Sequence, residues 1–176
     1  FQEEQSGIYQ MANGGTSVLV YSSWINDKNL AADEINFRFK EFNKLIFKDG
    51  YINNNSFRGY RAQWYHTYGL NIVLGYVYIA DLWGAKIPRK LKKKLINSSK
   101  VANLAIKDWD KFRKRKFDGK KSNVISDPLN ARKHTHQNAF GIDTLMEIVT
   151  GIKLENDPVY LPVSYTHLTL PTIYSV

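Results

Sequence analysis

Cysteine is missing from the 176-residue sequence, which excludes a disulfide framework and any cysteine-ligated metal site. The chain also lacks an apolar run of the roughly 18 residues that a membrane-spanning helix requires. Its first residues, FQEEQSGIYQ, do not contain the apolar segment of a secretory signal peptide. Because the chain begins at a phenylalanine, we expect native sequence to be missing before it. No membrane partner is expected from the residues present.

Acidic residues are few relative to basic ones: 16 aspartates and glutamates stand against 25 lysines and arginines, which gives a formal charge of +9. A positive surface favours a polyanionic partner, and nucleic acid, an anionic membrane and an acidic polysaccharide all fit that description. Two runs concentrate the charge, RKLKKKL at 89–95 and KFRKRKFDGKK at 111–121. Few aromatic residues lie among them, so a solvated surface is the simpler interpretation of both runs.

Strand signals are also scarce, whereas apolar residues recur at helical spacing along most of the chain. Clusters of glycine, asparagine or proline separate the apolar segments. One of them, KDGYINNN at 48–55, is expected to form a long surface loop. The segments expected to be helical are 16–25, 29–47, 61–82, 88–109 and 137–150. This pattern predicts an all-α fold of antiparallel helical hairpins, either a bundle or part of an α/α toroid.

Charge is absent from the final segment, VSYTHLTLPTIYSV at 163–176, which differs in composition from the chain before it. The segment resembles the translation of a sequencing adapter. We therefore divide the sequence into a partial helical domain at 1–161 and a non-native, adapter-derived tail at 162–176, and expect native sequence to be missing beyond it. The alternative is a native strand-forming segment, because Val, Tyr and Thr favour strands.

The segment RGYRAQWYHTYGL, at 58–70, combines two arginines, four aromatic residues and a histidine. On a helix, Arg61 and Tyr68 would leave the same face two turns apart, about 10 Å along the axis. Trp64 and Tyr65 lie between them. Such a face offers a guanidinium for a carboxylate, aromatic rings for a sugar and a phenol for proton transfer. The alternative is an ordinary amphipathic helix whose aromatic residues belong to the core.

This segment and the loop before it resemble the signature of the alginate lyase family of polysaccharide lyases. In that family a KDG loop precedes an arginine-rich segment, then RA and, a few residues later, YHNYAL. The corresponding residues are KDG at 48–50, Arg61 with Ala62, and YHTYGL at 65–70. The similarity covers residues 13–104 and implies an incomplete α/α toroid, present here as a fragment.

The resemblance implies an enzyme that cleaves a uronate-containing, alginate-like polysaccharide by β-elimination, without a cofactor or metal. It places the catalytic tyrosine at Tyr68 and the arginine that neutralises the substrate carboxylate at Arg61. Asn13 matches a carboxylate-binding asparagine, and Gly14 stands where the family usually has a histidine. This difference leaves one neutralising or proton-transfer group unassigned, for which His66 or a residue outside this sequence is a candidate.

Further substrate contacts are expected from the same segment. The candidates for substrate binding are His66, Trp64, Tyr65 and Arg58, although both aromatic residues could equally belong to the core and Arg58 could be a solvated loop charge. The resemblance also implies a periplasmic or secreted enzyme. We expect it to act as a monomer on an acidic polysaccharide, with no nucleic-acid partner.

A second histidine pair lies in ARKHTHQNAF at 131–140, where His134 and His136 are two residues apart. That spacing suits metal ligation from a strand but places the side chains on different faces of a helix. With no cysteine and no clear carboxylate partner nearby, we expect a helix start and not a zinc site.

Two other functions stay open at the level of sequence. The basic runs fit a non-catalytic polyanion-binding helical domain, for polysaccharide or nucleic acid. Gly14 also leaves room for a relative that binds polysaccharide without cutting it. New unsaturated ends from a uronate polymer would separate an enzyme from either kind of binder.

Overall fold

A computed structural model of the chain describes residues 7–115 and 142–155. In this part the regular structure is helical, apart from one isolated antiparallel β-bridge between Ile46 and Ile52. The all-α prediction is therefore confirmed. None of the described helices is long and apolar enough to cross a membrane. The helices are α1 (Ile8–Trp24), α2 (Lys28–Leu45), α3 (Ala62–Leu82), α4 (Arg89–Lys107), α5 (Trp109–Arg113) and α7 (Ile142–Thr150), with short 3-10 helices η2 (Asn55–Phe57) and η3 (Gly59–Arg61).

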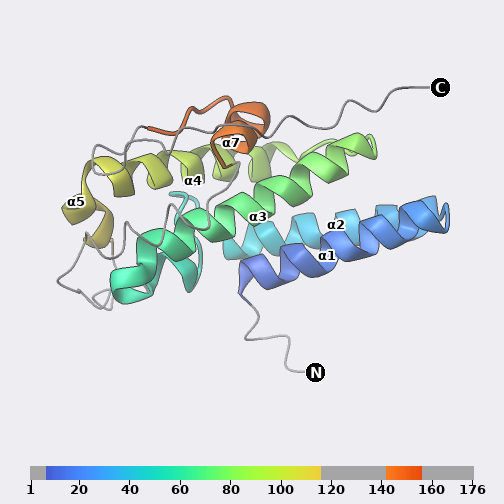
Figure 1. The fold of residues 1–176 in the computed structure, drawn as a ribbon, viewed down its shortest axis with the longest axis horizontal. Helices are drawn as coiled ribbons and strands as arrows, with labels where there is room; N and C mark the ends of the chain where they lie inside the picture. The colour runs from blue at the N-terminus through green and yellow to red at the C-terminus, as the bar shows by residue number, and fades with distance from the viewer. Residues whose placement is uncertain (1–6, 116–141, 156–176) are drawn as a thin grey trace, which may run out of the picture.

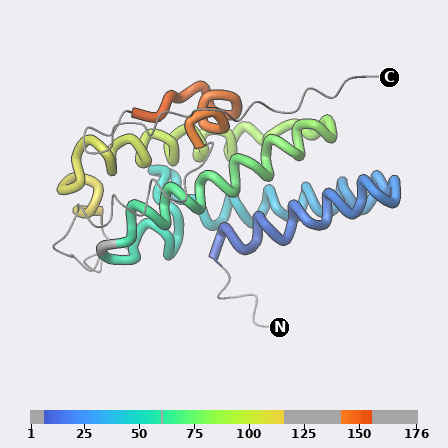
Figure 2. The backbone as a smooth tube through the Cα atoms, in the orientation of Figure 1, coloured from blue at the N-terminus to red at the C-terminus, as the bar shows by residue number. Residues whose placement is uncertain are grey.

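The helices are arranged as two antiparallel hairpins, α1 with α2 and α3 with α4 (Figure 1). The first helices of the two hairpins, α1 and α3, run in the same direction and lie against each other (Figure 2). α3 also contacts α4 and α7, so it is the central helix of the described part. This position explains why α3 is apolar on most of its sides, since neighbouring helices cover several of its faces.

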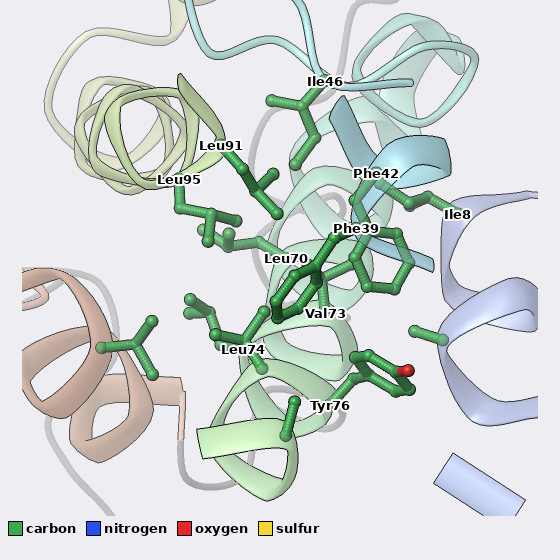
Figure 3. Close-up of a cluster of buried hydrophobic side chains, with 14 of the residues drawn as sticks. Ile8, Phe39, Phe42, Ile46, Leu70, Val73, Leu74, Tyr76, Leu91 and Leu95 are labelled. Carbon is green, nitrogen blue, oxygen red and sulfur yellow. The ribbon is translucent and has the colours of Figure 1, made fainter. Parts of the chain in front are cut away.

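The main core lies where α1, α2, α3 and α4 converge (Figure 3). Tyr76 of α3 packs edge-on against Phe42 of α2, with 5.3 Å between ring centroids. Edge-to-face packing of this kind is favourable beyond the area it buries. The large residues that are almost completely buried in this core include Ile8, Phe42, Ile46, Leu70, Leu74, Tyr76, Leu91 and Leu95.

α1 begins at Ile8, well before the expected start at residue 16. The asparagine and glycines at 13–15, which suggested a break, lie inside the helix. Gly15 is needed there, because a Cβ atom built on it would lie only 2.6 Å from Cε2 of Tyr76. Because Gly15 has no side chain, α1 can approach α3 closely. The expectation that glycine would break the helix here did not take this packing into account.

The expected ends of α3 and α7 agree with the structure. Gly84 follows α3 with φ of 79° and Gly151 follows α7 with φ of 72°, a region that glycine enters without steric cost. By contrast, the helix expected at 88–109 ends at Lys107, because the Asp108 side chain accepts a hydrogen bond from the Lys111 N–H at 2.8 Å and so starts α5. The tail at 162–176, the histidine segment at 131–140 and the start of the helix expected at 137–150 lie outside the described residues.

The prediction of a long surface loop at 48–55 is wrong. Tyr51 and Ile52 are buried, and the Tyr51 hydroxyl donates a hydrogen bond to the Phe112 carbonyl at 2.9 Å. Gly50 has φ of 96°, and its Cβ position lies 2.4 Å from the carbonyl carbon of Asn97 in α4. The segment packs back onto α4 because its apolar residues are buried. Its asparagine-rich composition did not indicate this burial.

Candidate active site

An aromatic cluster lies where the second turn of α3 meets the start of α1. Its central ring is Tyr68, which stacks parallel to Trp64 with an interplanar angle of 5° and 5.6 Å between centroids. On α1, Tyr9 lies 5.2 Å from Tyr68 and 6.4 Å from Tyr65. All four residues are partly exposed. The cluster therefore holds the Tyr68 ring at the surface instead of burying it in the core.

Arg58 belongs to the same cluster. Its guanidinium carbon lies 4.3 Å from the centroid of the Tyr65 ring, in the geometry of a cation–π contact. Tyr65 also meets the edge of Trp64, with 4.3 Å between centroids. These contacts tie the positive charge of Arg58 to the aromatic cluster, so it is not a loose loop charge. Part of the ring surface of Trp64 and of Tyr65 is therefore covered by neighbouring side chains of the cluster.

Arg61 is the last residue of η3 and directly precedes α3, and it is exposed. Its backbone, with φ of −93° and ψ of 5°, leaves the regular helical geometry at this residue. Tyr68 follows seven residues later within α3, so the two residues do not belong to one regular helix as the predicted spacing assumed. A guanidinium and a phenol nevertheless share the surface at the first two turns of this helix.

The position of Asn13 follows from the packing of α1 on α3. Two close approaches fix the register of these parallel helices: Ile8 Cγ2 lies 3.2 Å from the Cβ position of Gly69, and Tyr76 Cε2 lies 2.6 Å from that of Gly15. Asn13 is exposed and level with about residue 74 of α3. Figure 1 shows that α1 runs alongside α3 in the same direction and starts beyond the first turn of α3.

This register separates Asn13 from Arg61. With a rise of 1.5 Å per residue, Asn13 lies roughly one to two turns beyond Tyr68, and about 15 to 20 Å along the axis from Arg61. The two residues flank Tyr68 from opposite sides. The expectation that both hold one carboxylate is not supported by this placement, because two side chains at that separation do not converge on one group.

Gly14, next to Asn13, is exposed, and a Cβ atom built on it meets no atom within 4 Å. A side chain can therefore leave the helix at this position without meeting a neighbour at its Cβ atom.

His66 is completely buried and lies away from the exposed face of the cluster. Ser56 Oγ accepts the Ile52 N–H at 2.7 Å and donates to His66 Nδ1 at 2.7 Å, while His66 Nε2 donates to the Ser98 carbonyl at 3.0 Å. This arrangement uses both ring nitrogens of the neutral imidazole. Burial lowers the pKa of His66 to about 4, against the smaller opposing effect of the Ser98 hydrogen bond. His66 thus joins η2, α3 and α4, and its burial does not support the expected contact with substrate.

Tyr9 is the residue of this site that the sequence did not reveal. Tyr9 and Asn13 are four residues apart and lie on the same face of α1, a spacing that would have pointed to both had the helix been expected to begin at Ile8. For metal ligation the described residues offer no group of three or more histidine and acidic side chains. His134 and His136 are outside this part of the chain.

Comparison with known proteins gives no match: no protein-family profile, no curated protein and no solved structure matches the chain.

Proposed function

We propose that the protein is a polysaccharide lyase that cleaves an acidic, alginate-like polysaccharide by β-elimination. The observation that carries this proposal is the surface-held phenol of Tyr68, stacked on Trp64, in the first two turns of a helix that starts directly after the exposed Arg61. Those groups are the ones that a uronate requires: a cation for its carboxylate and a phenol for its proton.

In the proposed reaction the Tyr68 oxygen removes the proton from C5 of a uronate. The electron pair of that C–H bond forms a double bond between C4 and C5, and the C4–O glycosidic bond breaks. Tyr68 then returns the proton to the leaving oxygen. The C5 proton is hard to remove beside a carboxylate, so Arg61 neutralises that carboxylate and stabilises the enolate-like charge, an effect worth about 3 kcal/mol per donor in studied enzymes.

The flanking position of Asn13 changes its proposed part in this reaction. An amide on the far side of Tyr68 from Arg61 is placed to hydrogen-bond the neighbouring sugar of the polymer, and not the carboxylate that Arg61 binds. Tyr9 and Tyr65 provide the partly exposed aromatic surface between the two donors. This division of roles would align a polymer along the surface formed by α1 and α3.

The helix arrangement is compatible with an incomplete α/α toroid, which we propose as the complete fold. Two hairpins lie side by side with their first helices parallel, as consecutive units of such an array would. A polymer substrate would suit a periplasmic or secreted enzyme acting as a monomer, without a cofactor.

Turnover assays test this proposal. The full chain is incubated with mannuronate-rich alginate, guluronate-rich alginate and glucuronan, while the ultraviolet absorbance of unsaturated uronate ends is followed. A rise in absorbance with at least one polymer is expected. No rise with any of them, together with a salt-dependent shift of nucleic acid in a gel, would instead favour the polyanion-binding domain that the net charge of +9 suggests.

A further inference from the structure

A lysine-lined groove lies at the other end of α3 from Arg61. It has a volume of about 450 Å³ and lies between α2, the connection from α3 to α4, and the first turn of α4. No residue of the Tyr68 cluster lines the groove, and Phe39, which does, packs against Tyr76, about two turns after Tyr68 along α3. The residues that define its chemistry are Phe39, Lys40, Asn43, Lys86, Lys90 and Leu91.

The lysines around the groove are not paired with carboxylates of residues 7–115 or 142–155. Lys40, Lys86 and Lys90 are exposed, and none of them forms an ion pair with a carboxylate in the described part of the chain. Lys94, one turn after Lys90, donates a hydrogen bond to the Asn43 carbonyl. Burial and the charge of Lys90 both lower the pKa of Lys94, as expected where cations gather without an anion.

The floor of the groove has a different character from its rim. Phe39 and Leu91 are buried and line it with apolar surface. A floor of this kind favours a ligand that brings an apolar face to it.

We propose that this groove is a second binding site for uronate units of the acidic polysaccharide. One uronate supplies both complements: a carboxylate for the lysines of the rim and a C–H ring face for the apolar floor. This inference rests on the proposed function for the identity of the polymer, and it makes the groove a second binding site separate from the proposed cleavage site.

Binding measurements on the full chain test the groove directly. A mannuronate oligomer is titrated while the amide resonances of Ala85 and Leu91, which line the groove, are followed by NMR. Lys86→Ala/Lys90→Ala is expected to weaken the binding that these resonances report by about tenfold, since it removes two of the three cations that would pair with the carboxylate. Lys92→Ala/Lys93→Ala removes the same charge from exposed positions of α4 outside the groove and should leave that affinity unchanged.

Several results would overturn the inference. Unchanged affinity in Lys86→Ala/Lys90→Ala, or an equal loss in the control variant, would mean that the groove attracts anions only through general charge. Equal affinity for polyglutamate or inorganic phosphate would exclude the sugar as the preferred ligand. Turnover is measured separately: an inactive wild-type protein whose groove binds the oligomer contradicts only the lyase function, and an active protein whose groove does not bind it contradicts only this inference.

Discussion

The ring of Tyr68 lies parallel to the ring of Trp64, at an interplanar angle of 5° and a centroid distance of 5.6 Å. Trp64 is one helical turn before Tyr68, so the stacking is set within α3 and does not depend on a distant segment. Tyr9 of α1 contacts the same ring at 5.2 Å. The orientation of the proposed catalytic phenol is therefore fixed from two helices.

Removing the stacked indole should loosen Tyr68 without unfolding the protein. Trp64→Ala is expected to lower kcat by up to about tenfold, because an aromatic pair contributes about 0.5–1.5 kcal/mol. Trp64→Phe should retain most of the activity. The matched control is Trp24→Ala, at a tryptophan that is 83% exposed at the far end of α1. Steady-state kinetics on the best polymer would check this, and equal rates in Trp64→Ala and wild type would refute a positioning role for Trp64.

Tyr68→Phe should abolish the formation of unsaturated ends while oligomer binding persists. The substitution keeps the ring, and with it the contacts to Trp64 and Tyr9, but removes the hydroxyl that transfers the proton. Tyr21→Phe, at an exposed tyrosine elsewhere on α1, makes the same chemical change and should remain active. Ultraviolet absorbance measures turnover and calorimetry measures binding. If Tyr68→Phe still cleaves the polymer, Tyr68 is not the acid and base.

Gly14→His should fold normally and should not raise turnover. A Cβ atom at this position meets no atom within 4 Å, and replacing a glycine inside a helix with alanine removes a backbone-entropy cost of about 0.5–1 kcal/mol. An imidazole here would lie, like the Asn13 side chain, one to two turns beyond Tyr68 and far from the carboxylate that Arg61 is proposed to bind. Gly14→Ala is the matched control, and it should raise the melting temperature without changing kcat. A higher kcat in Gly14→His than in Gly14→Ala would contradict this placement of α1 along α3.

Buried neutral His66 should make the fold sensitive to acid. Its pKa is about 4 in the folded state against 6.5 as its ordinary value, so the unfolded chain binds the additional proton. The free energy of unfolding therefore does not vary with pH through His66 above pH 6.5. It decreases as the pH falls toward 4, by about 3 kcal/mol in total. Urea unfolding between pH 7.5 and 4, for wild type and His66→Gln, would check this. The variant should lose this part of the pH dependence; an identical profile in both proteins would assign it to other groups.

Two glycines of α3 should respond in opposite ways to alanine. A Cβ atom on Gly69 would lie 2.5 Å from the Asn55 side-chain nitrogen, which donates a hydrogen bond to the Tyr65 carbonyl at 3.0 Å. Gly69→Ala should therefore destabilise the protein by about 1–3 kcal/mol through overpacking. At Gly75 the nearest atom is Leu145 Cδ1 at 3.8 Å, so Gly75→Ala should stabilise by up to about 1 kcal/mol. Thermal unfolding of both variants measures this, and equal shifts would contradict the close packing of Asn55 in η2 against Gly69.

The sequence by itself determined the helical class, the bounds of α3 to within a residue, and the ends at Gly84 and Gly151. These features are local, since apolar periodicity and glycine at a helix end act over a few residues.

Only the tertiary structure decided which of these residues meet. It buried His66 between Ser56 and Ser98, brought Tyr9 against Tyr68, and placed Asn13 beyond Tyr68 instead of beside Arg61. The physical reason is that the register between α1 and α3 depends on close approaches at glycines that are distant in sequence. No periodicity within one helix specifies how far a neighbouring helix is shifted along it.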